Sequence, residues 1–174
     1  MIALRLWIQG ARLRTLPLSI GPVVLGSSLA HFYSSFDVLL CILAGLVSIF
    51  LQVGVNFAND YSDGIRGTDD FRVGPARLTS SGLVDASRVR QAALVALLLA
   101  VVCGLVVILI TGNWWLILVG LLSISAAWFY TGGSKPYGYA GLGEFSAFVF
   151  FGPVATLGTA FIMIGRVPPE SWPI

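Results

Sequence analysis

Five long apolar stretches, separated by shorter polar segments, constrain the fold of this chain more than any other feature of its sequence. A helix needs roughly 20 predominantly apolar residues to cross the hydrocarbon core of a bilayer. The stretches lie at about 16–32, 38–58, 89–110, 114–130 and 145–164, and each is close to that length. We therefore expect an all-α polytopic transmembrane helix bundle with five spans, the last of them kinked at Gly152-Pro153.

The composition excludes an ordinary soluble domain. The 174 residues are 57% hydrophobic and only 10% charged, whereas soluble domains carry roughly 25% charged residues. The two cysteines, Cys41 and Cys103, lie in separate apolar stretches and form neither a metal motif nor a disulfide framework. We expect the lipid bilayer as a partner, and no nucleic acid.

The segment before the first span is basic and amphipathic. Arg5, Arg12 and Arg14 surround Trp7 within residues 1–15. This pattern is typical of a segment that lies at the lipid headgroups. A cleavable signal peptide is the alternative, because small residues occur at 27–30, but the basic lead-in is long and another span follows at once.

The basic residues predict the orientation of the bundle. Nine of the ten lie in the N-terminal segment or in the two long polar loops, and only Arg166 lies on the other side. Because positive charge favours the cytoplasmic side, we expect the N-terminus and the loops at 60–88 and 131–143 to be cytoplasmic. Most acids fall on the same side, so the chemistry is expected there.

Polar side chains continue along one face of the second span. Gln52, Asn56, Asn59, Asp60 and Asp63 are spaced as neighbours on one side of a helix. Polar groups inside a membrane are costly and normally face a cavity, an ion or one another. Carboxylate and amide oxygens that converge in this way suit Mg²⁺, which in turn suits a diphosphate.

The loop after this span adds further charge. Asp69 and Asp70 follow Asp63, and guanidinium groups come with them at positions Arg66, Arg72 and Arg77. A diphosphate requires both metal and guanidinium, because metal bridges its oxygens and Arg pairs with those that remain. An ordinary charged cytoplasmic loop is the alternative for Asp69 and Asp70, and more so for Asp85.

Residues 59–63 (NDYSD), followed by Gly67-Thr68-Asp69, resemble the first aspartate-rich motif of the UbiA superfamily of intramembrane prenyltransferases. The wider block from Asn56 to Leu78 is similar to the 1,4-dihydroxy-2-naphthoate polyprenyltransferase branch of that superfamily. The superfamily's usual spacing places a third acid at Gly67, and the displacement to Asp69 is typical of this branch. The resemblance implies metal ligation by Asp60, Asp63, Asp69 and Asn59.

A second block lies at residues 128–138 (WFYTGGSKPYG), where an aromatic helix end meets a glycine turn that carries the only lysine. It is not a P-loop, because the Walker spacing and the preceding strand are absent. The block also resembles the naphthoate enzymes, and the resemblance places Tyr130 and Lys135 at the substrate pocket. The alternative for Lys135 is that its charge serves only to fix the orientation of the chain in the membrane. Tyr137 and Tyr139 are weaker candidates, expected mainly to pack.

The resemblance implies a Mg²⁺-dependent enzyme that transfers a polyprenyl group from polyprenyl diphosphate to 1,4-dihydroxy-2-naphthoate, an aromatic acid, with loss of its carboxylate. The product is demethylmenaquinone, and the location is the cell (plasma) membrane. The implied catalytic residues are Asp60, Asp63, Lys135 and Tyr130. Residues implied to bind the diphosphate are Asn56, Asn59, Arg66, Arg72, Arg77 and Tyr61, and candidates for stabilising an allylic cation are Phe57, Tyr61 and Tyr130.

The resemblance covers nearly the whole chain, yet members of the family have about nine spans and a second aspartate-rich motif in a later loop. Neither the further spans nor that motif occurs in these 174 residues. We therefore expect residues 1–174 to be the N-terminal part of a single intramembrane prenyltransferase domain. By itself this part is expected to bind diphosphate poorly and to turn over little or not at all.

Two alternatives stay open. Another enzyme of the same superfamily would share the aspartate motif and use a hydroxybenzoate or haem acceptor. A non-enzymatic transporter or cation-binding scaffold would use the stripe from Gln52 to Asp63 to line a path, although the segments at 32–36 and 111–113 offer few polar groups at the outer mouth. A CDP-alcohol phosphotransferase is not supported, because its DGxxAR pattern is absent.

Overall fold

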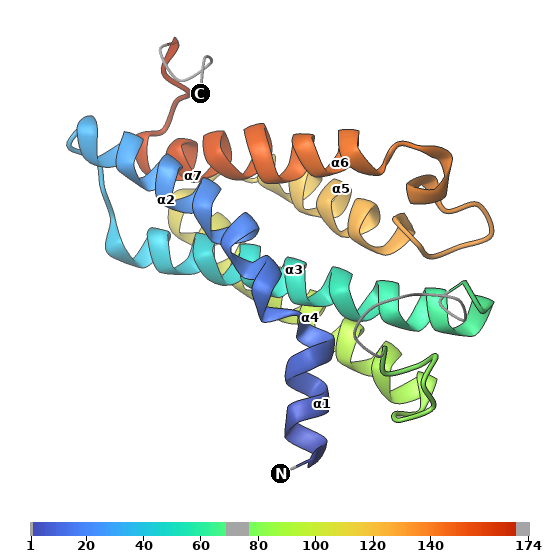
Figure 1. The fold of residues 1–174 in the computed structure, drawn as a ribbon. Helices are drawn as coiled ribbons and strands as arrows, with labels where there is room; N and C mark the ends of the chain where they lie inside the picture. The colour runs from blue at the N-terminus through green and yellow to red at the C-terminus, as the bar shows by residue number, and fades with distance from the viewer. Residues whose placement is uncertain (1, 69–76, 170–174) are drawn as a thin grey trace.

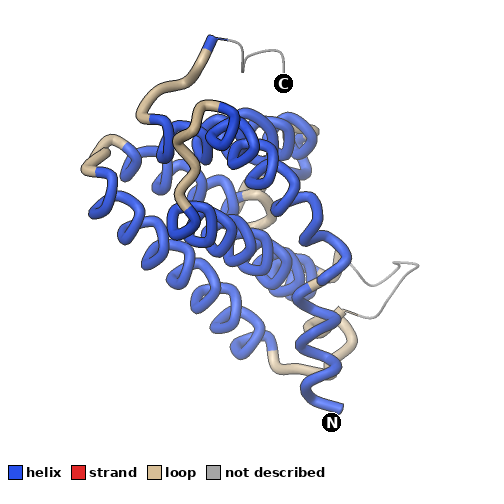
Figure 2. The backbone as a smooth tube through the Cα atoms, turned by 90° about the vertical axis from the view of Figure 1, so that its left-hand side faces the viewer, coloured by secondary structure: helices blue, strands red, loops and turns tan. Residues whose placement is uncertain are grey.

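The computed structural model describes residues 2–68 and 77–169, and all regular structure within these ranges is helical (Figure 2). The elements in chain order are α1 (Ile2–Ala11), η1 (Leu13–Thr15), α2 (Leu16–Phe32), α3 (Val38–Arg66), α4 (Ala86–Thr111), α5 (Leu116–Phe129), η2 (Tyr137–Ala140), α6 (Gly143–Val149), η3 (Phe150–Val154) and α7 (Ala155–Ile164).

The helices agree with the expected spans in number and position. Four helical stretches are long and apolar enough to cross a membrane: Leu4–Phe32, Val38–Arg66, Ala86–Thr111 and Gly143–Ile164. The helix expected at 114–130 is shorter, with 14 residues in α5. The protein is an all-α integral membrane protein.

The helix of the second span extends about two turns beyond residue 58, where the apolar span is expected to end. α3 continues past residue 58 to Arg66, so the acids and amides belong to the helix itself. It ends at Gly67, which adopts a left-handed φ of 70° that a side chain would disfavour. The amide of Thr68 then bonds back to the Asp63 carbonyl at 3.2 Å. The helix therefore carries its polar groups about 12 Å beyond residue 58, at 1.5 Å per residue.

α3 is the central element of the bundle. It packs along α4 and also contacts α1, α2, α5 and α7. Figure 1 shows the end of α3, the loop that leads into α4 and the loop that follows α5 together at one end of the molecule. The short turns that join α2 to α3 and α4 to α5 lie at the opposite end (Figure 1). The two chemistry-bearing blocks of the sequence are thus brought to the same end.

The N-terminal helix docks beside the end of α3. Trp7 packs edge-on against Phe57, with ring centroids 5.7 Å apart. Gly10 permits a close approach, because a Cβ there would lie 2.6 Å from Leu78 Cδ1 and 2.7 Å from Phe57 Cε1. This contact belongs to a buried cluster that comprises Phe57, Ala58, Leu78, Val89 and Ala93.

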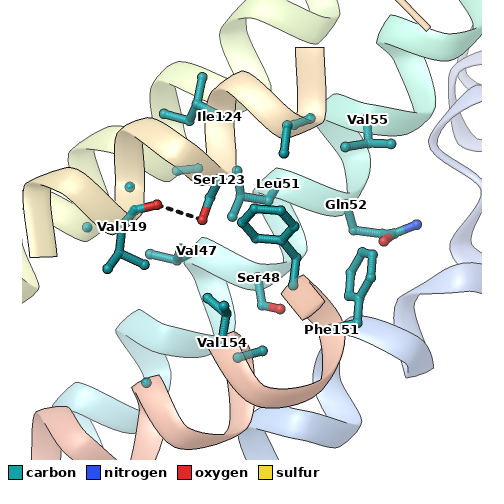
Figure 3. Close-up of a pocket in the computed structure, with 18 of the residues that line it drawn as sticks. Val47, Ser48, Leu51, Gln52, Val55, Val119, Ser123, Ile124, Phe151 and Val154 are labelled. Carbon is teal, nitrogen blue, oxygen red and sulfur yellow. Dashed lines mark hydrogen bonds between the residues drawn. The ribbon is translucent and has the colours of Figure 1, made fainter. Parts of the chain in front are cut away.

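The expected kink at Gly152-Pro153 is present. A π-helical segment, η3, separates α6 from α7, and Gly152 has non-helical angles of φ −96° and ψ −105°. Proline lacks the amide hydrogen that the next helical bond requires, which is why the helix deforms here. Phe151 and Val154 of this segment line a cavity inside the bundle (Figure 3).

Candidate active site

A cavity of about 450 Å³ lies between α3, α4, α5 and the α6–α7 segment. Most of its walls are apolar; Figure 3 shows Val47, Leu51 and Val55 of α3 facing Val119 and Ile124 of α5. The polar side chains of the lining are Ser48, Gln52, Asn56, Asn59, Ser123, Tyr130, Tyr137, Ser146 and Thr159. The cavity is therefore mainly apolar, with amide, hydroxyl and phenol groups in its walls.

The first part of the polar stripe binds the N-terminal segment. Asn56 Nδ2 donates to the carbonyl of Ala11 at 2.9 Å and to Thr15 Oγ1 at 3.0 Å. Gln52 Nε2 donates to the same hydroxyl at 3.0 Å. The hydroxyl of Thr15 itself donates to the carbonyl of Arg12 at 2.9 Å. Asn56, predicted to bind diphosphate, thus joins α3 to the segment before α2.

Asn59 and Arg66 hold the loop that follows α5. Thr131 Oγ1 donates to Asn59 Oδ1 at 2.7 Å. The guanidinium of Arg66 donates to the carbonyls of Thr131 and Gly133, and it lies 5.9 Å from the ring centroid of Tyr139. Arg66 was predicted to bind the diphosphate. In the structure its guanidinium group donates to backbone carbonyls of this loop instead.

Asp60 faces the other loop. Its Oδ2 accepts from the amide of Leu78 at 3.0 Å, and its Oδ1 accepts from the amide of Thr79 at 2.9 Å. The residue is 1% exposed. Both carboxylate oxygens of this predicted metal ligand are therefore engaged by the backbone that leads into α4.

Asp63 lies where the two loops meet. The phenol of Tyr139 donates to Oδ1 of Asp63, and Arg77 Nη2 stands 3.6 Å from its Oδ2. Partial burial raises the pKa of Tyr139, and the hydrogen bond to Asp63 raises it further. The phenol therefore keeps its proton at neutral pH and acts as a donor to the carboxylate.

Helix geometry explains why neighbouring residues reach different loops. Consecutive side chains on an α-helix point about 100° apart, so Asn59 and Asp60 diverge, whereas Asn59 and Asp63 share a face. Tyr61 lies further round and packs against the buried cluster that contains Phe57. The cavity lining includes neither Tyr61 nor Phe57. Tyr130 does line the cavity, and the roles of Tyr61 and Phe57 toward substrate stay predictions.

Two of the predicted metal ligands, Asn59 and Asp63, lie on one face of α3. Within ranges 2–68 and 77–169, no three His, Cys, Asp or Glu side chains form a cluster that could hold a metal ion. Asn59 and Asp63 offer oxygen donors of the type that Mg²⁺ prefers. Asp69, Asp70 and Arg72, which the sequence also singled out, lie outside the described residues.

The second sequence block provides aromatic and hydroxyl groups. Tyr130 contacts Tyr137 edge-on, with ring centroids 5.6 Å apart. Tyr137 donates to the Ala126 carbonyl at 2.7 Å and lies 2.9 Å from Ser146 Oγ. Lys135 is exposed in the turn between them. Tyr137 and Tyr139, expected mainly to pack, both use their hydroxyls.

Sequence reasoning missed several polar partners. Thr15 and Thr131 carry hydroxyls that bind the amides of α3, and Ser146 faces the cavity. No spacing rule marks an isolated threonine in a loop as the partner of a helix 30 or more residues away. Only the tyrosines, concentrated in one glycine-rich turn, gave a signal in the sequence.

Asp85, for which an ordinary structural role was the alternative, caps α4. Its side chain accepts from the amide of Ser87 at 2.8 Å, and hydrogen bonds from Ser87 lower its pKa. Such a residue at the start of a helix needs no ligand to account for it.

The fold and site define an integral membrane protein with a mainly apolar cavity inside a helix bundle. Acid, amide and guanidinium groups meet at the end of α3 and in the loops beside it. Residues 19–174 match the UbiA prenyltransferase family. The chain belongs to that family.

Three relatives illustrate the match, and each is described as 1,4-dihydroxy-2-naphthoate octaprenyltransferase. The protein of Mycobacterium tuberculosis (strain ATCC 25618 / H37Rv) is 53% identical over 161 residues, which cover 92% of this chain and 55% of the relative. The protein of Escherichia coli (strain K12) is 33% identical over 169 residues, which cover 94% of this chain and 55% of the relative. The protein of Bacillus subtilis (strain 168) is 33% identical over 167 residues, which cover 95% of this chain and 53% of the relative.

The chain thus spans about half the length of the curated relatives it matches. No solved structure gives a significant match.

Proposed function

We propose that the protein serves in the transfer of a polyprenyl group from polyprenyl diphosphate to 1,4-dihydroxy-2-naphthoate, on the cytoplasmic side of the plasma membrane. The observation that carries this proposal is the cavity of about 450 Å³, which is mainly apolar and has Asn59 and Tyr130 in its lining. The names of the relatives support the choice of acceptor.

The prenyl tail occupies the apolar body of the cavity. Val47, Leu51 and Val119 are typical of its walls (Figure 3), and burial of hydrocarbon is favourable by roughly 25 cal/mol per Å² of apolar surface. The diphosphate then lies beyond Asn59, near Asp63 and Arg77. These groups fall at the end that gathers most of the basic loops, and the positive-inside rule supports a reaction at the cytoplasmic face.

Asn59 and Asp63 would hold Mg²⁺, together with Asp69 as the sequence motif implies. When bound, the metal neutralises charge on the diphosphate oxygens as that group leaves. Arg77 and Lys135 add positive charge on the same side, and an Arg fork suits two phosphate oxygens at once. Asp60 belongs to the same motif, but both of its oxygens accept from backbone amides.

The reaction joins a ring carbon to the first carbon of the prenyl chain. The bond between that carbon and the diphosphate oxygen breaks, and its electron pair leaves with the diphosphate. The ring carbon that bears the carboxylate forms the new bond, and loss of CO₂ returns an electron pair to the ring, which gives the quinol form of demethylmenaquinone. Tyr130 presents an aromatic ring to the developing allylic cation, and the apolar walls keep water away from it.

The test uses membranes that contain the protein produced from its complete coding sequence. They are supplied with a labelled polyprenyl diphosphate, Mg²⁺ and either dihydroxynaphthoate or hydroxybenzoate. We expect a prenylated product and stoichiometric CO₂ with dihydroxynaphthoate, and none after chelation of divalent metal. Prenylation of hydroxybenzoate instead would assign a different acceptor, and binding of cations without any transfer would favour the transporter or scaffold.

A further inference from the structure

Asp60 has the surroundings of a structural anion. It is 1% exposed, and each of its oxygens accepts a backbone hydrogen bond, from Leu78 at 3.0 Å and from Thr79 at 2.9 Å. Burial of a carboxylate costs free energy unless hydrogen-bond donors surround it. Hydrogen bonds from backbone amides to a charged carboxylate are stronger than those between neutral groups. The carboxylate is therefore well matched to two adjacent amides.

These two amides belong to a segment that is fixed on its other side as well. Leu78 is 1% exposed and belongs to the buried cluster with Phe57. Thr79 packs closely on α3 at Gly64. A Cβ added to Gly64 would lie 2.5 Å from the Cβ of Thr79. The segment 77–79 is thus seated between α1 and the last turns of α3.

Arg77 immediately precedes this seated pair. Its Nη2 stands 3.6 Å from Asp63 Oδ2, and both side chains are largely buried, at 9% and 13% exposure. The position of this guanidinium depends on where the backbone of residues 78 and 79 is held. Asp60 and Asp63 lie three residues apart on α3. Asp60 therefore holds the backbone of residues 78 and 79, and Asp63 contacts the guanidinium of Arg77.

We propose that Asp60 is a positioning residue, which holds the amides of Leu78 and Thr79 so that Arg77 lies beside Asp63 and pairs with the substrate diphosphate. This rests on the proposed function, and it gives the first acid of the motif a role different from metal ligation. An asparagine at position 60 would keep one acceptor but turn an NH₂ group toward a backbone donor, which explains why the anchor is an acid.

The experiment measures binding of a non-reactive prenyl thiolodiphosphate at a series of Mg²⁺ concentrations, so that it does not depend on transfer. The protein is produced from its complete coding sequence and compared with Asp60→Asn, Arg77→Gln and the double variant. Gly64→Ala displaces the same segment in a different way. Its added Cβ pushes Thr79 away from α3 and leaves the charge of Asp60 unchanged. Thr79→Ala and Gly21→Ala are controls, because the first keeps the amide and the second adds a Cβ with no atom within 4 Å.

We expect Asp60→Asn and Gly64→Ala each to weaken binding about tenfold or more, the effect of losing one charged contact of roughly 1.4 kcal/mol. Neither should add to the loss caused by Arg77→Gln, and neither should change the Mg²⁺ concentration for half-maximal binding. A direct metal ligand would instead raise that Mg²⁺ concentration, add to Arg77→Gln and be insensitive to Gly64→Ala, and this result would overturn the proposal.

The result for Asp60 can be separated from the result for the proposed function. Binding that follows the expected pattern without prenyl transfer to dihydroxynaphthoate would remove the proposed acceptor and leave the role of Asp60 supported. Absence of binding by the unchanged protein would overturn both. If Asp60→Asn does not fold, Gly64→Ala alone decides, because a loss that vanishes in the Arg77→Gln background supports positioning and an additive or absent loss contradicts it.

Discussion

The phenol of Tyr139 donates a hydrogen bond to the carboxylate of Asp63, 76 positions earlier in the chain. Arg77 approaches the same carboxylate from the loop that leads into α4. Three segments that are distant in sequence therefore meet at one acid on α3. The arrangement makes Asp63 the point from which the site can be tested.

Tyr139→Phe removes the donor to Asp63 while it keeps the ring beside Arg66. We expect about a tenfold fall in prenyl-transfer kcat/KM, because hydrogen bonds to charged groups contribute roughly 1.5–3 kcal/mol and this one is partly exposed. Initial rates with membranes that contain equal amounts of protein provide the measurement. Tyr33→Phe serves as the control and should leave the rate unchanged. Tyr33 follows the C-terminal end of α2, at the end of the bundle away from Asp63 (Figure 1). An unaltered rate for Tyr139→Phe would show that Asp63 does not need this donor.

Arg66→Lys tests the tie between α3 and the loop after α5. Lysine keeps the charge but lacks the planar fork that reaches the carbonyls of Thr131 and Gly133 together. We expect backbone amides in residues 131–140 to exchange hydrogen severalfold faster, with those at the centre of α4 unchanged. Equal protection in both proteins would mean that the loop is held by other contacts.

Thr15→Val removes the hydroxyl that receives both Gln52 and Asn56. The side chain has nearly the same shape, but the amide groups of Gln52 and Asn56 each lose one acceptor, and Asn56 keeps the carbonyl of Ala11. The cost of leaving a buried donor unsatisfied is roughly 1–3 kcal/mol. We expect a lower midpoint in thermal unfolding of the detergent-solubilised protein. Thr15→Ser keeps the hydroxyl and should retain the original midpoint. A midpoint that Thr15→Val leaves unchanged would contradict the hydrogen-bond network.

Gly10→Ala should loosen the docking of α1. The added Cβ would lie 2.6 Å from Leu78 Cδ1, and overpacking of this kind costs roughly 1–3 kcal/mol. Faster hydrogen exchange in residues 2–11 is the expected result, and Leu78→Val in the same protein should reverse part of it. Gly21→Ala, where nothing lies within 4 Å, should have no such effect. Equal exchange in all variants would show that α1 does not depend on this contact.

The fold could be predicted to a large extent because a bilayer demands long apolar segments. The bounds of α2 agree with the expected span at both ends. Helical spacing indicated that α3 reaches Asp63, but its end at Arg66 could not be placed from hydropathy, because most of residues 59–66 are polar. In the structure Asn59, Asp60 and Asp63 find partners in two loops.

The residues of the site could be nominated from sequence, but their partners could not. Helical spacing placed Asn59 and Asp63 on one face. Asn59 lines the cavity, and Asp63 contacts Tyr139 and Arg77. The same spacing grouped Asp60 with them, yet a difference of one residue turns it toward Leu78 and Thr79. The target of Arg66 is a pair of backbone carbonyls, and backbone groups leave no mark in a sequence.

The most direct test of the account is Asp63→Ala in the protein produced from its complete coding sequence. Transfer of a polyprenyl group to dihydroxynaphthoate is measured in membranes, alongside the amount of protein inserted. The account predicts that transfer is abolished while insertion is unchanged, because Asp63 joins the metal donors to both loops. Transfer at the original rate by a normally inserted variant would contradict the assignment of this site.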